Sequence, residues 1–205
     1  MATRRAPMQN SRGFSLQEVL VVLAIGLIVT AMALPAMSNA IANMKLRGSM
    51  TTVSGLLQNA RAVAVKENKT KTACHYNTTI DPYPLVYFVR DTTDCTSLTA
   101  TTADVQVELE APITPLSAPS GTGAPTLITN AQMGLTADPL TTDPSFNSRG
   151  LPCTYAGGSI CTTNSGFVQY FKDNRFGASG GWAAISISPA GRIKRWFWNG
   201  ATWTD

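Results

Sequence analysis

Histidine, charged residues and common catalytic motifs are scarce in this sequence. His75 is the only histidine among 205 residues, and Lys, Arg, Asp and Glu together make up 14% of the chain. One histidine leaves no scope for a histidine-rich metal site. The one serine with Gly-x-Ser-x-Gly spacing, Ser179 in residues 177–181 (GASGG), stands in a turn-like glycine run without a following helix pattern. We therefore expect a protein that is not an enzyme and holds neither metal nor cofactor, with His75 as an ordinary residue at a strand end.

Charge is absent from residues 19–44, and Glu18 is the only charged residue between positions 14 and 44. As a helix, residues 14–36 would extend about 35 Å at about 1.5 Å per residue, more than a bilayer core of about 30 Å. Because Arg4, Arg5 and Arg12 precede this segment, the N-terminus is expected to be cytoplasmic. The sequence predicts one membrane span.

Glu18 is unusual beside such a helix. A carboxylate within a span costs about 2.5 to 3.5 kcal/mol at the centre. It becomes tolerable when an opposite charge lies close by. We therefore expect Glu18 to have a partner.

Residues 13–18, GFSLQE, resemble the cleavage and methylation motif of type IV prepilins. Gly13 would precede the cut, Phe14 would follow it, and Glu18 would be the fifth mature residue. Pro35 stands where many pilins have a proline. Two further stretches, residues 59–64 (NARAVA) with Cys74 shortly after and residues 185–192 (ISISPAGR), are similar to the GspH/FimT family of minor pseudopilins and minor pilins.

The resemblance implies processing and partners. A prepilin peptidase would remove residues 1–13 and leave Phe14 with a free, methylated amino group. In a filament, Glu18 of one subunit would pair with the Phe14 ammonium of a neighbour. The alternative is an ordinary secretory signal that is cut near Ala31 or Ala36.

Net charge gives little information on partners. Three of the 16 basic residues lie in the proposed leader, which leaves 13 against 12 acidic residues in the mature chain. The isoelectric point near 9.0 is therefore mostly a leader effect and does not by itself indicate nucleic-acid binding. The acids between positions 81 and 143 are interpreted as a solvated loop region.

The pattern after the span predicts an α+β fold, and the resemblance implies a pilin-like arrangement of it. Residues 14–38 would form the transmembrane half of a long helix, with a bend at Pro35. Residues 39–68 would form its amphipathic half and residues 69–205 a periplasmic, β-rich head. Strands are predicted at residues 71–75, 85–90, 105–109, 166–172, 182–188 and 192–198. The proline-rich tract 111–144 is expected to be a surface loop outside the core.

The four cysteines suggest disulfide bonds in an exported domain. They allow three connectivities. We favour the sequential pairs, Cys74 with Cys95 and Cys153 with Cys161, because each would close a loop-rich segment. Zinc is the weaker interpretation, since no two cysteines have Cys-x-x-Cys spacing.

Basic residues near the C-terminus suggest a second candidate function, DNA binding. Arg192, Lys194 and Arg195 lie close to Trp196, Trp198 and Trp203, and such residues suit phosphate contact with base stacking. Some FimT-like minor pilins have a DNA-binding Gly-Arg-x-Arg motif, but here Lys194 stands at its fourth position. Lysine keeps the charge but loses the planar fork of arginine. The alternative is a charged strand edge with tryptophans packed on the head.

These observations predict a minor pilin or pseudopilin of a type IV pilus or a type II secretion pseudopilus. It would be anchored in the bacterial inner membrane with its head in the periplasm, and would assemble with other subunits through its N-terminal helix. The alternative function is DNA binding during natural transformation.

Overall fold

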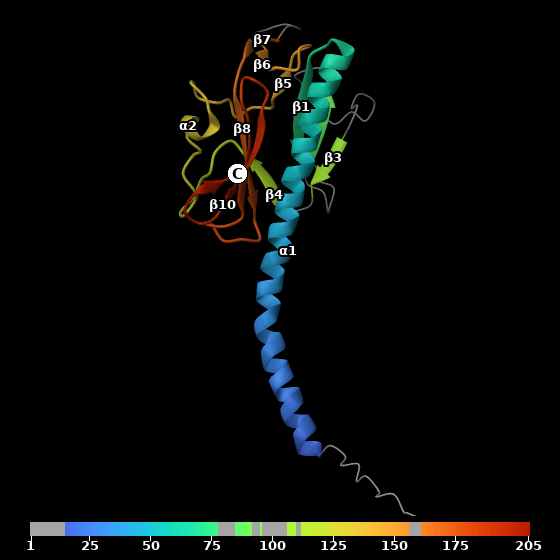
Figure 1. Cartoon of the computed structure of the whole chain (residues 1–205), viewed down its shortest axis with the longest axis vertical. Coiled ribbons are helices and arrows are strands. Elements are labelled where there is room, and N and C mark those ends of the chain that lie inside the picture. Colours follow the sequence, from blue (N-terminus) through green and yellow to red (C-terminus); the bar gives the residue numbers. More distant parts are fainter. Residues whose placement is uncertain (1–14, 78–84, 92–94, 96–105, 110–111, 156–160) are drawn as a thin grey trace, which may run out of the picture. The chain divides into compact units, whose positions relative to one another are not determined.

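A computed structural model describes residues 15–77, 85–91, 95, 106–109, 112–155 and 161–205 (Figure 1). The elements are, in order, α1 (Leu16–Glu67), β1 (Lys71–Asn77), β2 (Leu85–Arg90), β3 (Gln106–Leu109), β4 (Ile113–Leu116), α2 (Asn130–Met133), β5 (Ser145–Phe146), β6 (Pro152–Tyr155), β7 (Cys161–Asn164), β8 (Phe167–Asp173), β9 (Trp182–Ile187), β10 (Ile193–Trp198) and β11 (Trp203–Thr204). The contacts divide the chain into two units, with the boundary inside α1 between Ile41 and Ala42.

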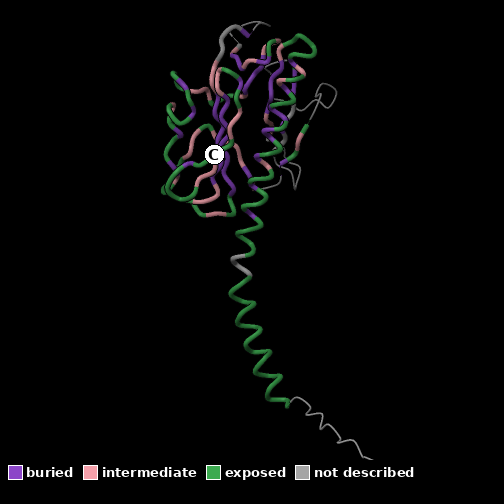
Figure 2. The backbone as a smooth tube through the Cα atoms, in the orientation of Figure 1, coloured by how far each residue is buried: buried purple, intermediate pink, exposed green. Residues whose placement is uncertain are grey.

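The first unit contains the apolar half of α1. Residues 15–33 and 37–41 of this unit are all exposed (Figure 2). The helical assignment continues through Pro35. In length and composition, this part of α1 is sufficient to cross a membrane.

The second unit begins with the amphipathic half of α1. Helical spacing predicts an apolar face of Val53, Leu56, Leu57, Ala60, Val63 and Ala64. All of these except the half-buried Val63 belong to the main core. The helix ends at Glu67, and Asn68 follows in the left-handed conformation with φ of 52°. Such a residue commonly terminates a helix.

A six-stranded antiparallel sheet packs on this face of α1. Its strand order is β3-β2-β1-β5-β6-β7. Alternate residues of its strands enter the core beside the helix, among them Ala73, Tyr87, Leu109 and Phe146. Because side chains alternate between the faces of a strand, their neighbours lie on the far face of the sheet.

The other sheet is five-stranded, with the order β11-β10-β9-β8-β4. Every residue of β8 and β9 is buried. Phe171, Ile185 and Ile187 join the core with α1, whereas Tyr170 and Ala184 belong to a second core cluster. This sheet is therefore covered on both faces.

The tract that contributes to the cover of the second face of this sheet was predicted incorrectly. The tract 111–144 was expected to be a surface loop, but it contains β4 and α2. Ile113 is fully buried, and Ile128, Met133 and Leu135 contribute to the second cluster. Pro115 is compatible with a strand here because β4 lies at the sheet edge, where a missing N–H leaves no ladder bond unmade.

The six predicted strands are present as β1, β2, β3, β8, β9 and β10. β2 has the predicted ends, β3 agrees over its described residues, and the ends of β1, β8, β9 and β10 differ from the prediction by one or two residues. Residue 105, the predicted first residue of β3, lies outside the described part. The sequence did not predict β4, β5, β6, β7 or β11. The predicted class is nevertheless confirmed: the fold is α+β, with a long N-terminal helix and antiparallel sheets in a pilin-like arrangement.

Candidate functional site

The start of α1 presents Glu18 in the first helical turn. The Glu18 backbone N–H lies 3.2 Å from the Ser15 hydroxyl oxygen and 3.0 Å from the Ser15 carbonyl oxygen, both of which can accept its hydrogen. Ser15 therefore caps the helix, and the partial positive charge of a helix N-terminus favours a carboxylate at this place. Gly13 and Phe14, the predicted cleavage pair, lie outside the described residues.

Apolar side chains follow Glu18 along the helix without protein cover. Leu16, Leu20, Leu23 and Leu27 recur at intervals of three and four residues and are exposed by 61 to 84%. This spacing places them on one face of α1. A contiguous apolar surface of this kind needs lipid or other helices to cover it.

The N-terminal sequence has a known counterpart. Residues 8–34 match the family model of the prokaryotic N-terminal methylation motif. This match supports a type IV pilin-like N-terminus. The motif implies prepilin processing and assembly with other pilin subunits, and the exposed apolar helix fits a membrane-anchored pilin. No curated protein and no solved structure is significantly similar to the chain.

The three predicted DNA contacts do not form one cluster. Arg195 lies on the face of β10 that packs toward α1, where its Nη1 donates to the Thr51 hydroxyl at 2.7 Å. Lys194 is on the opposite face and pairs with Asp205 at 2.7 Å. Arg192 precedes β10 and is exposed. The alternation of β10 therefore separates the basic side chains between two faces of the sheet.

The tryptophans near these residues are mostly enclosed. Trp196 and Trp203 are 4% and 6% exposed, and their ring N–H groups donate to the Ser186 hydroxyl and the Thr126 carbonyl. Trp198 is half-buried and meets Trp203 edge-on. Packing on the head is thus their main role in this structure, and two of the three rings are not accessible for base stacking.

Residues 59–64 and residues 185–192, from which the GspH/FimT type was predicted, meet in space. Arg61, from residues 59–64, donates from Nη1 to the carbonyl oxygen of Gly191 at 3.1 Å. Gly191 has a φ of 80°, and a Cβ atom there would lie 3.1 Å from Arg61 Cζ. Glycine therefore permits both the turn and the close approach of the arginine. Helical periodicity predicts that Arg61 lies on the polar face of the helix, and it does not indicate this contact.

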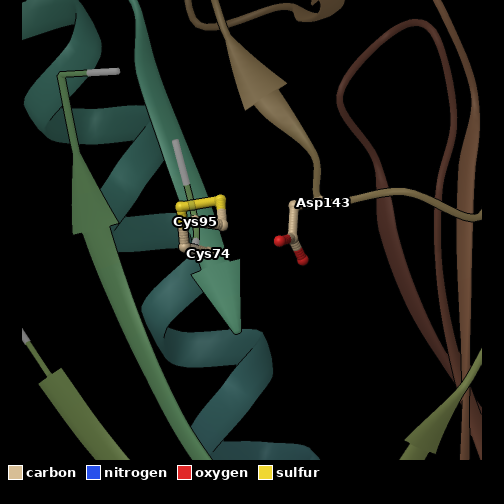
Figure 3. A group of neighbouring side chains, drawn as sticks. All are labelled: Cys74, Cys95 and Asp143. Atoms are coloured by element: carbon tan, nitrogen blue, oxygen red, sulfur yellow. A yellow bond between two sulfur atoms is a disulfide. The ribbon is translucent and has the colours of Figure 1, made fainter. Parts of the chain in front are cut away.

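The cysteines form the sequential pairs, Cys74 with Cys95 and Cys153 with Cys161. Asp143 lies beside the first pair (Figure 3). One ligand atom from each of Cys74, Cys95 and Asp143 falls within 4.8 Å of the others, a spacing suitable for a metal ion. However, both sulfurs are committed to the disulfide, and metal binding requires thiolates. This group is therefore not a metal site while the disulfide is intact.

His75 and Asp143 form a polar contact that the sequence did not indicate. His75 lies inside β1 rather than at its end, and its Nδ1 is 2.5 Å from Asp143 Oδ1. Beside them is a hollow of about 410 Å³, which is lined by residues of both sheets, among them Thr72, Asp143, Ser145 and Phe167. The prediction that His75 is an ordinary strand-end residue was wrong.

Proposed function

We propose that this chain is a minor pilin or pseudopilin of the GspH/FimT type, a structural subunit of a type IV pilus or type II secretion pseudopilus. The observation that carries the proposal is Glu18 in the first turn of an exposed apolar helix, within the methylation motif of residues 8–34. The similarity of residues 59–64 and 185–192 to that family supports the finer assignment.

The proposed mechanism of assembly follows from the electrostatics of the helix start. After cleavage behind Gly13, the amino group of Phe14 carries a positive charge close to Glu18. In a bundle of such helices, Glu18 of one subunit pairs with the ammonium group of another. The pairing offsets the desolvation of both charges and sets the axial register of the helices.

Orientation and maturation follow from the same segment. Residues 1–13 remain in the cytoplasm until a prepilin peptidase removes them, and residues 14–38 anchor the chain in the inner membrane. The head then lies in the periplasm. The function is structural, and the proposal assigns no reaction to the chain.

Mass spectrometry of the N-terminus tests maturation. The expected mature chain begins at methylated Phe14. A chain that retains Met1, or one that begins near residue 37, would contradict the proposal.

Glu18→Ala tests assembly, with Gln17→Ala as the matched control one residue away. The Glu18 variant should be cleaved and membrane-bound but poorly incorporated into filaments, because the Phe14 ammonium loses its counter-charge. The Gln17 variant should assemble normally. Normal incorporation of Glu18→Ala, measured by immunoblotting of sheared filaments, would exclude the charge-pairing mechanism.

DNA binding is the second candidate, and its support is the exposure of Arg192 and Arg195. The enclosed tryptophans and the Lys194–Asp205 pair argue against a stacking surface. A mobility-shift assay that compares the wild type with an Arg192→Ala, Lys194→Ala, Arg195→Ala variant distinguishes the two functions. Salt-sensitive retention by the wild type alone would favour DNA binding.

A further inference from the structure

Four polar side chains meet where the two sheets of the head adjoin. His75 comes from β1, Tyr87 from β2, Gln169 from β8, and Asp143 from the segment before β5. β1 and β2 belong to the six-stranded sheet, whereas β8 belongs to the five-stranded sheet. The cluster therefore connects the two sheets through side chains.

Hydrogen bonds link the four residues in a chain. Asp143 Oδ1 lies 2.5 Å from His75 Nδ1 and 3.0 Å from Gln169 Nε2, and Asp143 Oδ2 accepts from the His75 backbone N–H at 3.3 Å. The Tyr87 hydroxyl donates to Gln169 Oε1 at 3.2 Å. An ionised carboxylate can only accept, so His75 Nδ1 carries a hydrogen.

Backbone contacts hold the Asp143 segment against both sheets. Leu140 exchanges hydrogen bonds with β8 and its neighbour, from Leu140 N to Gly166 O and from Val168 N to Leu140 O, each at 2.8 Å. Ala73 of β1 donates to Pro144 O at 3.0 Å. Asp143 is therefore fixed between β1 and β8, and it faces His75 through a defined geometry.

Burial makes this contact sensitive to charge. The Asp143 side chain is 13% exposed and that of His75 is 31% exposed. The carboxylate thus lies in a region of lower dielectric than water, while the histidine can exchange protons with solvent. Asp143 also lines the hollow between the sheets.

Within the described part of the chain, the titratable groups facing His75 are Asp143 and Tyr87. Burial raises the pKa of Tyr87 well above 10.0, so Tyr87 stays neutral near neutral pH. β8 contributes the neutral Gln169, and the Cys74–Cys95 disulfide next to His75 does not titrate. Asp143 is therefore the group that responds to the charge of His75.

We propose that His75 and Asp143 form a proton-controlled latch that joins the two sheets of the head. With a protonated histidine, the contact is an ion pair with a hydrogen bond. With a neutral histidine, only the weaker neutral hydrogen bond remains. The contact between His75 and Asp143 is stronger at acidic pH and weaker at alkaline pH. Its weakening affects the boundary between the two sheets, where the hollow lies.

The direction of the pH effect follows from the contact itself. The hydrogen bond from His75 to Asp143 raises the pKa of His75 above 6.5, against an opposing effect of burial. Protonation is then favoured in the folded head relative to the unfolded chain. The stabilisation is complete below pH 6.5 and is lost as the pH rises through the higher pKa of the folded state.

The single histidine permits a direct test on the full chain in detergent micelles. With ¹³C-labelled histidine, NMR shows one imidazole signal, and its titration midpoint should lie above 6.5 in the wild type. Asp143→Asn should lower the midpoint. Asp138→Asn is the matched control, because Asp138 is exposed and bonds to Asn130, and it should leave the midpoint unchanged.

A second measurement tests the latch rather than the titration alone. The wild-type free energy of unfolding should fall as the pH rises from 6 to 9, and His75→Gln should remove that part of the pH dependence. Hydrogen exchange of the His75 backbone amide should also accelerate as the pH rises, by a larger factor than the intrinsic exchange rate of an unprotected amide does. A wild-type midpoint at or below 6.5 would overturn the proposal even if every variant failed to fold, and so would an unchanged pH dependence in His75→Gln.

Discussion

At the scale of single residues, the buried ammonium group of Lys71 connects β1 to the end of α1 and to the end of β2. Its side chain is 2% exposed, and Nζ pairs with Glu67 of α1 at 2.8 Å and with Asp91 just after β2. The hydrogen bond from Lys71 is the main reason that the pKa of Asp91 lies below 3.8. Because a buried ammonium is costly without counter-charges, these acids determine whether Lys71 is tolerated.

Asp91→Asn should therefore lower the free energy of unfolding by about 1 to 2 kcal/mol, the range for a hydrogen bond to a charged group at a half-exposed partner. Asp138→Asn should change it by less than about 0.5 kcal/mol. Denaturant titrations at pH 7 measure both. The lowered pKa means that the Asp91 contribution is present above pH 3.8 and is lost in stronger acid, so the two proteins should converge there. Equal stabilities at pH 7 would contradict this prediction.

Gly191 is a second residue with a measurable role. Gly191→Ala places a Cβ atom against Arg61 and forces an L-residue to adopt a φ of 80°, whereas Gly200→Ala meets only the backbone strain, at a φ of 101° with open space around it. Left-handed strain costs about 1 to 2 kcal/mol. Thermal melts should show both variants destabilised and Gly191→Ala more so. If the two variants lower the melting temperature equally, the contact of the new Cβ atom with Arg61 does not contribute to the loss of stability.

At the scale of elements, the sequence predicted those with a clear apolar pattern or a characteristic composition. The apolar face of the second half of α1 could be predicted from its helical periodicity, and β1, β2, β3, β8, β9 and β10 from alternation or from enrichment in β-branched and aromatic residues. The two-residue strands β5 and β11 have too few residues for a pattern. β4 contains Pro115 and lies in a proline-rich tract, so its composition indicated a loop.

The features of the candidate site also divide into those that the sequence could predict and those that it could not. Residues 13–18 form a local motif and could be found from the sequence alone. The His75–Asp143 pair could not, because its partners are 68 positions apart and lie in segments without a chemical signature. Alternation along a strand is enough to place Lys194 and Arg195 on opposite faces of β10. It cannot show that Asp205 pairs with Lys194 or that Trp196 is buried.

The two disulfides close loops of different length, with separations of 21 and 8 residues. Chain-entropy estimates give about 3 kcal/mol for the longer loop and about 2.5 kcal/mol for the shorter one. Replacing Cys74 and Cys95 together with serine should therefore destabilise the head at least as much as replacing Cys153 and Cys161. Urea unfolding under non-reducing conditions measures this. A cost below about 1 kcal/mol for either pair would contradict the estimate.

At the scale of the whole molecule, exposed apolar side chains are concentrated in the N-terminal part. Among the large exposed hydrophobic residues described, only Val65 and Leu127 lie beyond Met44. Residues 42–205 form a compact unit of their own. The surface that requires lipid or neighbouring helices therefore lies almost entirely in the N-terminal stretch of α1.

A fragment of residues 42–205 should consequently remain monomeric without detergent, whereas the full chain should require it. Analytical ultracentrifugation measures the difference, and circular dichroism checks that the fragment is folded. Aggregation of the folded fragment would show that the head has a further apolar surface, and detergent-free solubility of the full chain would contradict the membrane assignment.

The burial of β8 and β9 on both faces has a consequence for sequence variation. Every position from Phe167 to Asp173 and from Trp182 to Ile187 is buried. The apolar side chains pack either into the core that contains α1 or into the second cluster, to which residues 112–140 contribute. In saturation mutagenesis we expect substitutions to be poorly tolerated at every position of both strands, rather than at every second position as in a sheet with one face in solvent. Homologues should therefore diverge least in this hairpin, and its residues offer the best anchor for aligning distant relatives.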